Sequence, residues 1–336
     1  MRRTLLVFLA TFCLSVNYAQ VMDKEKYLRT NDLDSLDGWK IGGLVSVNGS
    51  QVSLTNWNAG GQNSISMNGL TSLYANLTKG NSHWENSLDL GYGIQRQGSK
   101  DNVRWIKTDD KIDLDSKFGR KASKMWYYSA LMNFNTQFTD GYNYPNDSVR
   151  ISRFMAPGYL LLAAGMDFRP HKIFSAFIAP FTMKTTFVLD QDLANAGAFG
   201  VDGIDTTGST VIPGKMVRFE AGGYIKLIYT HEIMENIKIT SKLGLFSNYL
   251  HNPQNIDVNW ETLVQFKVNK FISATLSTHL IYDDDIDIAV YDDSGVLTGR
   301  GPRLQFKEVL SVGFAYKFPA KKETEKVEKV KKEDNK

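Results

Sequence analysis

The chain has 336 residues, a formal net charge of +3 and a single cysteine. So small a charge excludes the strongly basic surface by which proteins bind nucleic acid. Beyond the N-terminal segment no run of about 20 apolar residues exists, so no helix is expected to span a bilayer.

The first predicted element is a secretory signal peptide over residues 1–19. Two arginines precede an apolar run from Leu5 to Val16, which is the pattern of a cleaved export signal. The only cysteine, Cys13, lies inside this segment. The exported chain is therefore expected to contain neither disulfides nor cysteine metal sites. Residues 20–38 are predicted to form a periplasmic N-terminal segment.

Long extended segments follow, in which apolar and polar residues alternate. Near residue 258, for example, Val258 and Trp260 share one face of a strand, while Asn259 and Glu261 share the other, because strand side chains alternate with a period of two. One apolar and one polar face is typical of strands in a transmembrane β-barrel. Twelve such segments are predicted, at residues 40–53, 63–79, 83–97, 104–118, 124–140, 156–169, 173–189, 216–233, 237–250, 255–268, 271–284 and 304–318.

The connections between these segments alternate in length. Every second one is a tight turn, and the others are mostly longer and rich in Gly, Asn and Asp. This regularity favours an all-β fold, a transmembrane antiparallel barrel with short periplasmic turns and longer extracellular loops, over a soluble β-sandwich. The barrel is predicted to occupy residues 39–318, followed by a charged periplasmic tail over residues 319–336.

The last predicted strand resembles the terminal-strand signal of bacterial outer-membrane barrels. The polar, glycine and aromatic positions of that pattern fall on Ser311, Gly313, Tyr316 and Phe318. The resemblance implies insertion by the barrel-assembly machinery and a location in the outer membrane.

A second resemblance rests on the segment from Trp39 to about Leu189 and above all on its Asn-Trp-Asn-Ala-Gly-Gly stretch, residues 56–61. This segment resembles the DUF3078 family, which implies an exported outer-membrane protein of a Bacteroidota bacterium and supplies no catalytic residues. Two interpretations of the stretch stay open. Trp57, Gly60 and Gly61 either form a tight turn at the barrel rim or provide a docking surface for a partner.

Charged residues of both signs fall on the polar faces of several strands. A twelve-stranded barrel is narrow, so these charges either pair across the interior and stiffen it or line a thin solute path. The mixture of signs argues against strong selection of anions or cations. The candidate lumen-lining residues are Lys107, Asp109, Lys111, Asp113, Arg218, Glu220, Lys226, Asp257 and Glu261.

Other polar clusters favour simpler interpretations. The aspartates within residues 283–293 could hold Ca²⁺, but a solvated loop is the simpler account. Ser277 and His279 share a face, as a hydrolase would need, yet that face is predicted to point into the lumen. No catalytic residue, metal site or cofactor is predicted.

The sequence thus predicts a non-enzymatic integral outer-membrane β-barrel, an accessory or structural component of a multiprotein cell-envelope assembly. The alternatives are a narrow solute channel and, third, an outer-membrane hydrolase. The expected partners are outer-membrane lipid and other envelope proteins.

Overall fold

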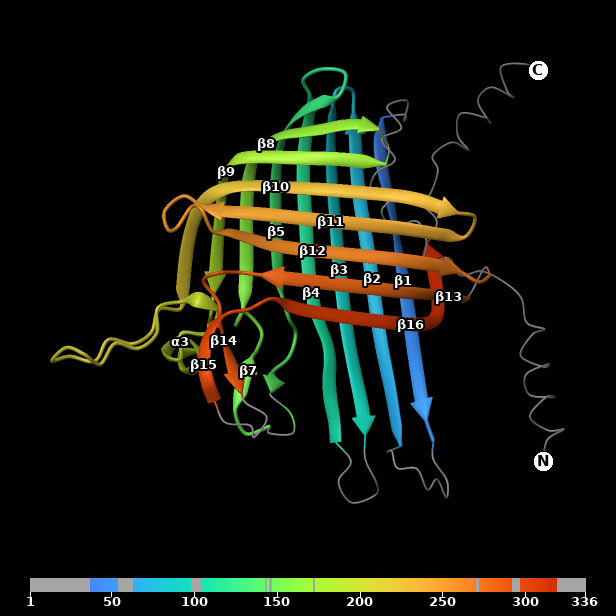
Figure 1. The fold of residues 1–336 in the computed structure, drawn as a ribbon. Helices are drawn as coiled ribbons and strands as arrows, with labels where there is room; N and C mark the ends of the chain where they lie inside the picture. The colour runs from blue at the N-terminus through green and yellow to red at the C-terminus, as the bar shows by residue number, and fades with distance from the viewer. Residues whose placement is uncertain are drawn as a thin grey trace, which may run out of the picture.

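A closed ring of twelve antiparallel strands forms the body of the protein (Figure 1). The computed structural model describes residues 37–53, 63–97, 104–142, 144, 147–171, 173–269, 272–291 and 297–318. Among these residues, no helix has the length and apolar character needed to cross a membrane. The predicted signal peptide, the loop around Trp57 and the charged tail lie outside the described residues.

Each barrel strand pairs with its neighbours in the chain, and the first strand closes the ring against the last. The twelve strands agree with the predicted segments to within about four residues at either end, the margin expected for boundaries read from sequence. Their bounds are β1 Gly38–Val52, β2 Ser64–Lys79, β3 Ser82–Gln97, β4 Arg104–Lys121, β5 Trp126–Thr136, β8 Gly158–His171, β9 Phe174–Phe187, β10 Val217–Met234, β11 Ile237–Asn248, β12 Ile256–Lys267, β13 Ile272–Tyr282 and β16 Gln305–Phe318.

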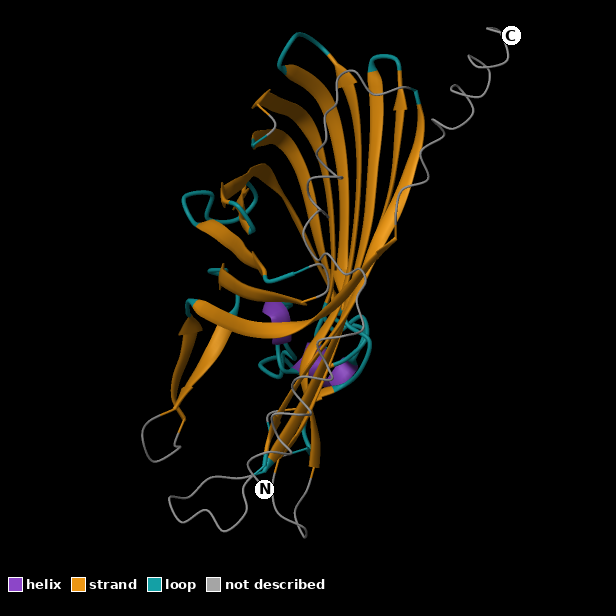
Figure 2. Cartoon of the chain, turned by 90° about the vertical axis from the view of Figure 1, so that its right-hand side faces the viewer, coloured by secondary structure: helices purple, strands orange, loops and turns teal. Residues whose placement is uncertain are grey.

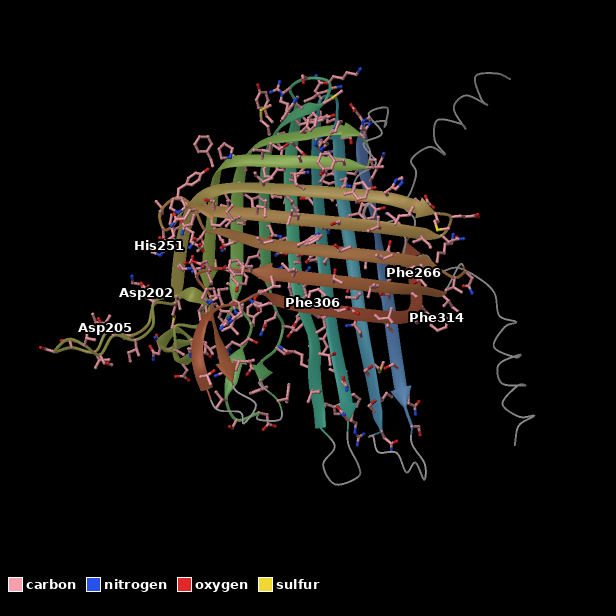
Figure 3. All side chains as sticks on the ribbon, viewed as in Figure 1. Asp202, Asp205, His251, Phe266, Phe306 and Phe314 are labelled. Atoms are coloured by element: carbon pink, nitrogen blue, oxygen red, sulfur yellow. The ribbon has the colours of Figure 1, made fainter. Side chains whose placement is uncertain are left out.

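The strands turn their apolar residues outward. In β5, Tyr128 is 62% exposed on the outer face, while its neighbours Tyr127 and Ser129 are buried inside. Phe266, Phe306 and Phe314 lie along the outer face of the front wall (Figure 3). An apolar exterior around a largely polar interior is the architecture of a transmembrane barrel, so the predicted fold is confirmed.

The barrel is flattened into two walls that face each other. In Figure 1 the strands β1 to β5 run vertically behind β10 to β13 and β16, which run across the front; Figure 2 shows the same walls from the side. Tight turns, such as Gly80-Asn81 and Glu235-Asn236, lie at one rim, the turn rim. The longer connections lie at the opposite rim, the loop rim. Side chains from opposite walls can therefore meet.

The wall bends where β8, β9 and β10 meet. The β9 segment from Ala179 to Thr182 contains one residue more than the facing parts of β8 and β10, so it forms a bulge. Pro180 lies in this bulge, where a missing N–H costs least. The extra residue also moves the inward positions of β9 from odd numbers, such as Phe177, to even numbers, such as Lys184.

Gly165 of β8 faces this bulge at a distance that leaves no room for a side chain. A Cβ on Gly165 would collide with the backbone oxygen of Ile178, whereas a Cβ on Gly69 would have its nearest neighbour at 3.9 Å. Gly165→Ala is therefore expected to lower the free energy of unfolding by about 1–3 kcal/mol. Denaturant unfolding in detergent micelles measures this. Gly69→Ala is the matched control, and equal stability of the two variants would contradict the account.

Smaller elements gather at the loop rim, where the sequence predicted only loops. Residues 188–201 pack around a core of their own, formed by Ala156, Val188, Leu193, Ala194 and Val201. The β9–β10 connection is therefore a folded cap. The additional elements are β6 Gly141–Tyr142, β7 Arg150–Ser152, α3 Gln191–Asn195, η1 Ala198–Gly200, β14 Asp287–Tyr291 and β15 Leu297–Pro302.

Candidate functional site

The barrel interior is the candidate site, because ion pairs gather in it at three levels. Nearest the turn rim, Arg169 lies between two carboxylates. Its Nη1 is 2.9 Å from Glu85 Oε1 and its Nη2 is 2.6 Å from Asp167 Oδ2. Lys117 Nζ contacts the same two residues, at 2.9 Å from Asp167 and 3.3 Å from Glu85. The guanidinium of Arg169 also lies over the Tyr127 ring. Two cations and two carboxylates thus form a closed, buried group, here called the turn-rim cluster.

A second cluster lies nearest the loop rim and joins more distant strands. Lys184 Nζ of β9 is 2.7 Å from Asp257 of β12 and 3.2 Å from Asp283, which follows β13. Arg218 Nη2 is 3.0 Å from Oε2 of Glu220, a residue only 1% exposed. The backbone of Gly200, in the folded cap, lies against the Arg218 guanidinium. This loop-rim cluster therefore connects the front wall to the cap.

Between the two clusters, ion pairs join the opposite walls directly. Lys111 Nζ of β4 is 2.9 Å from Asp113 and 3.6 Å from Glu261 Oε1 of β12. In the ring, β4 and β12 are six strands apart in either direction, so they lie diametrically opposite. Lys307 of β16 lies 2.8 Å from Asp109 of β4, another contact between the two walls. These pairs hold the flattened barrel together across its lumen.

A cavity of about 350 Å³ remains between β1–β4 and the facing strands β11, β12, β13 and β16. Hydroxyl and amide side chains supply much of its lining, among them Ser46, Asn68, Thr240 and Gln265. Charges of both signs project into it, so it has no strong preference for one sign of ion. The charged lining residues are Lys111, Lys238, Lys242, Lys307, Asp89, Asp109 and Glu261.

The structure places eight of the nine predicted lumen-lining residues inside and one outside. Lys107 lies opposite Ile94 on the outer face, because Thr108 is an extra residue in β4 relative to β3. The predicted interior position of Lys107 is therefore wrong. Its Nζ is 2.9 Å from Asp110 on that outer face, and Asp110 also accepts hydrogen bonds from the N–H groups of Phe138 and Thr139. The eight residues inside are Asp109, Lys111, Asp113, Arg218, Glu220, Lys226, Asp257 and Glu261.

Sequence reasoning missed the central cations of both clusters. Asp167 and Arg169 both point inward at the end of β8. The alternation of charged with apolar residues there could have identified Arg169 from the sequence. Lys184 lies beyond the bulge of β9, so a strict alternation of faces along the strand places its side chain on the outer face instead of the inner one. Only the paired structure reveals Lys184.

The terminal-strand residues lie in β16 as the sequence predicted, and the structure gives their backbone positions. Gly313, Tyr316 and Phe318 pair with Asn48, Val45 and Gly43 of β1. Ser311 pairs with Thr275 of β13. Their role as an assembly signal stays a prediction. Trp57, Gly60 and Gly61, the predicted docking loop, lie outside the described residues.

His279, the residue considered for a hydrolase site, lies beside Asn259 and Glu261. Its Nε2 lies 2.9 Å from Asn259 Oδ1 and 3.8 Å from Glu261 Oε1, and it lines the cavity together with Ser277. The described residues also contain no group of three or more His, Cys, Asp or Glu side chains arranged to hold a metal ion. The absence of catalysis stays a prediction.

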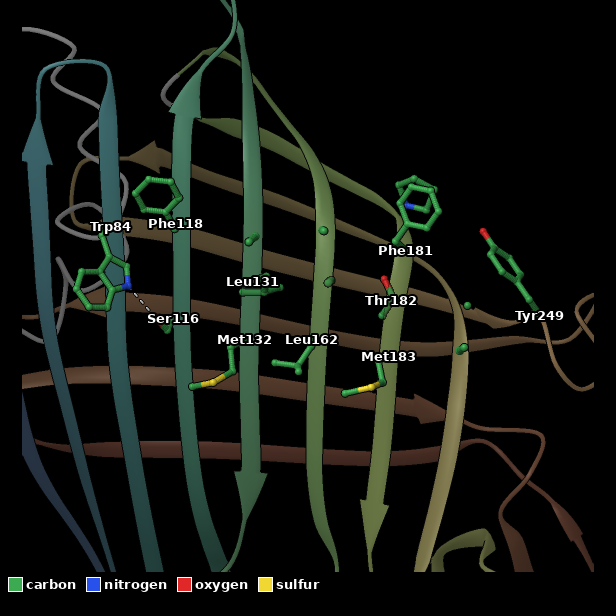
Figure 4. A pocket seen from close by; sticks show the side chains of 16 residues that line it. Trp84, Ser116, Phe118, Leu131, Met132, Leu162, Phe181, Thr182, Met183 and Tyr249 are labelled. Carbon is green, nitrogen blue, oxygen red and sulfur yellow. Dashed lines mark hydrogen bonds between the residues drawn. The ribbon is translucent and has the colours of Figure 1, made fainter.

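A groove of about 710 Å³ runs along the outer wall from β3 across β4, β5, β8 and β9 to β10 (Figure 4). Its floor includes Ala130 and Ala164, and its sides include Phe118, Met132 and Phe181. Its lining is mostly apolar and its outer side is open. This is a surface suited to lipid, the partner predicted for the outer face. The one polar contact that Figure 4 marks joins Trp84 Nε1 to Ser116 Oγ at 2.9 Å.

Asp190 holds the folded cap in place. Its carboxylate accepts hydrogen bonds from the N–H groups of Asp192 and Leu193 at the start of α3. It also lies 3.2 Å from Arg150 and 3.3 Å from Arg153. Burial raises the pKa of Asp190, but the Leu193 N–H and the two arginines outweigh burial and hold that pKa below its ordinary value of 3.8.

Asp190→Ala is expected to destabilise residues 188–201 by about 1–2 kcal/mol, the usual cost of losing a helix cap. Hydrogen exchange and limited proteolysis of this segment measure the change, with exposed Asp192→Ala as the control. Because the folded pKa is depressed, the stabilisation is fully present above the ordinary pKa and is lost as the pH falls through the depressed value. Protection of the cap that stays constant as the pH falls well below the ordinary pKa would contradict the account, since the unfolded segment then binds a proton at Asp190 and is favoured over the folded cap.

A family model matches part of the chain. Residues 50–142 match the model of the family described as "Protein of unknown function (DUF3078)". The resemblance predicted from residues 56–61 is thereby confirmed over the part of the chain from the end of β1 to β6. No curated protein matches the chain.

Several solved structures match the chain at low sequence identity and low TM-score. The translocator domain of the autotransporter NalP from Neisseria meningitidis is 9% identical, with a TM-score of 0.36 over 87% of this chain and 91% of that one. An outer membrane channel from Pseudomonas putida F1 is 11% identical, with a TM-score of 0.38 over 86% and 98%. A FadL homologue of Pseudomonas aeruginosa is 10% identical, with a TM-score of 0.29 over 83% and 89%.

Proposed function

We propose that the chain is an integral outer-membrane β-barrel that catalyses no reaction and serves as an accessory or structural component of a multiprotein cell-envelope assembly. The observation that carries this proposal is the contact between opposite walls, Lys111 of β4 with Glu261 of β12. An open channel needs a continuous wet path. In this barrel the walls meet through side chains, so the interior acts as a brace.

Three features support a scaffold in the membrane. The apolar outer face suits lipid, with residues such as Phe181 at 78% exposed and Leu310 at 71%. The turn-rim and loop-rim clusters stiffen the barrel between its rims. The folded cap, fixed by Asp190, offers a defined surface beyond the membrane rather than a loose loop. A rigid barrel with a structured cap is suited to hold partners.

Gentle extraction from native membranes tests this function. The protein is solubilised in mild detergents and its native size is measured by light scattering, with a heated, dissociated sample as the reference. The proposal predicts a discrete complex larger than the lone barrel. Recovery as a lone barrel under every mild condition would contradict it.

A second candidate, a narrow solute channel, is favoured by the cavity of about 350 Å³. Its polar lining would suit a small uncharged or zwitterionic solute, because lysines and carboxylates are both present. Ion pairs on either side of the cavity, at Lys226 and Lys307, would have to separate before such a solute could pass. The scaffold therefore agrees better with the geometry.

A further inference from the structure

The seam that closes the barrel is shorter than the other ladders of the barrel. Within the described residues, β1 and β16 pair over six positions, from Gly43 with Phe318 to Asn48 with Gly313. On its other side β16 pairs with β13 over ten positions, from Gln305 to Phe314. The two seam strands therefore separate toward the loop rim. Among the residues that the structure describes, residues 305–312 of β16 pair with β13 on one side and have no strand partner on the other.

Figure 1 shows this separation. β16 runs across the front wall and meets β1 at the right-hand edge, while β1 continues downward and away from it. The end of β1, Gly49–Val52, keeps its pairing with β2 but has no β16 residue opposite it. The backbones of the two strands thus diverge toward the loop rim, and we call the gap between them the wedge. We refer to residues 305–312 as the free edge.

The free edge has an apolar outer face and an inner face that lines the cavity, like the rest of the barrel. Phe306, Leu310 and Val312 point outward and are 60%, 71% and 58% exposed. Lys307 and Val309 point inward and line the cavity, which Ser46 and Asn48 of β1 also line. The cavity therefore reaches both sides of the wedge.

Lipid alone cannot complete such an edge. In hydrocarbon every backbone N–H and C=O requires a hydrogen-bond partner, which acyl chains do not provide. Along a strand paired on one side, alternate residues direct both groups to the open side. The backbone N–H and C=O groups of the free edge therefore need a partner with its own row of backbone donors and acceptors. Such a partner is an extended strand.

We propose that the free edge binds an extended strand of a partner envelope protein, which adds antiparallel to β16 and fills the wedge. This inference rests on the proposed function, since it names how the barrel joins an assembly. The partner strand is amphipathic, with apolar residues beside Phe306 and Leu310 and polar residues beside Lys307. Eight residues give a contact about 27 Å long, because a strand rises about 3.4 Å per residue.

A second copy of the chain fits the free edge less well. Antiparallel pairing of two copies of residues 305–312 needs a two-fold axis in the plane of the membrane. Such an axis would turn one barrel upside down. Exchange of seam strands between upright copies avoids this inversion, and it would give a dimer whose size distinguishes it from the proposed complex.

Engineered cysteine pairs test whether the wedge is open. The exported chain is expected to contain no other cysteine, because Cys13 belongs to the predicted signal. In the pair Val47→Cys/Phe314→Cys, the two residues face each other in the ladder. In Gly49→Cys/Val312→Cys, they lie one step beyond its end. We expect a disulfide in the first pair, which serves as the control for folding and oxidation, and none in the second. Equal cross-linking of both pairs would overturn the proposal, because the seam would then close on itself.

A peptide tests what the free edge accepts. The probe is a synthetic copy of residues 44–52, since β1 already pairs with β16; the control is the same peptide with alternate backbone nitrogens methylated. The purified barrel in detergent is expected to exchange the amides of residues 305–312 quickly, and the unmodified peptide to slow them roughly tenfold. Fast exchange that neither peptide changes would overturn the proposal.

Two further results would also overturn it. If residues 305–312 are protected in the purified barrel and light scattering gives a monomer, the edge is satisfied within one chain. If the size is that of a dimer, a second copy covers it. Either result leaves the proposed function open to its own test, because the size of the complex extracted from native membranes is measured without the peptide.

Discussion

Arg169→Met is expected to lower the free energy of unfolding by about 3–5 kcal/mol, the usual result of removing one partner from a buried ion pair. Arg169 is 5% exposed and lies between Glu85 and Asp167. Without it, two largely buried carboxylates share Lys117 as their remaining cation in the turn-rim cluster. Denaturant unfolding in detergent micelles, followed by tryptophan fluorescence, measures the change.

Two further variants separate charge pairing from a general loss of stability. Lys215→Ala removes an exposed ion pair with Asp202, in which both side chains are at least 70% exposed, and is expected to cost less than about 1 kcal/mol. Adding Glu85→Gln and Asp167→Asn to Arg169→Met removes the unpaired charges and is expected to recover part of the loss. A loss for Arg169→Met no larger than that for Lys215→Ala would show that the cluster does not brace the barrel.

Glu261→Lys is expected to turn a silent barrel into a conducting one. The new cation would face Lys111 from the opposite wall, at a position where the original pair is 3.6 Å apart. Repulsion would separate the walls, and the cavity, already lined by four lysines, would become strongly positive. A ring of one sign selects ions of the opposite sign. Planar-bilayer recordings should therefore show resolvable, anion-selective current steps.

The charge-swapped variant Lys111→Glu/Glu261→Lys is the matched control. It restores an ion pair between β4 and β12, although it reverses the pair's orientation, and it is expected to return the trace to the silent state. A trace that stays flat for Glu261→Lys alone, in a correctly folded barrel, would mean that other contacts keep the walls together without this pair.

The barrel strands could be predicted because their apolar residues face lipid and their polar residues face the interior, which gives an alternating pattern along each strand. A strand with lipid on one side and a polar interior on the other must alternate, as β12 does from Val258 to Phe266. Turn residues such as Gly80, which has a positive φ, then separate the strands. These local signals suffice for the number, order and approximate ends of the strands.

The candidate site could be predicted only in part, because its geometry depends on bulges and on the curvature of the walls. One extra residue at Thr108 moves Lys107 to the outer face, and one near Pro180 turns Lys184 inward. The insertion at Thr108 has no clear sequence signal. Pro180 is compatible with a bulge but does not specify which face the following residues take. The contact of Lys111 with Glu261 joins strands that are far apart in the chain, and it arises from the flattening of the whole ring. The folded cap was missed because its helix is a single short turn.

Ionic current through the wild-type barrel is the most direct test of the central claim, that side chains from opposite walls close the lumen. The purified protein is inserted into a planar bilayer and recorded over a wide range of voltages, with insertion verified by its heat-dependent mobility on a denaturing gel. The structure predicts no current steps at any voltage. Stable, reproducible steps from the correctly folded wild-type barrel would contradict it.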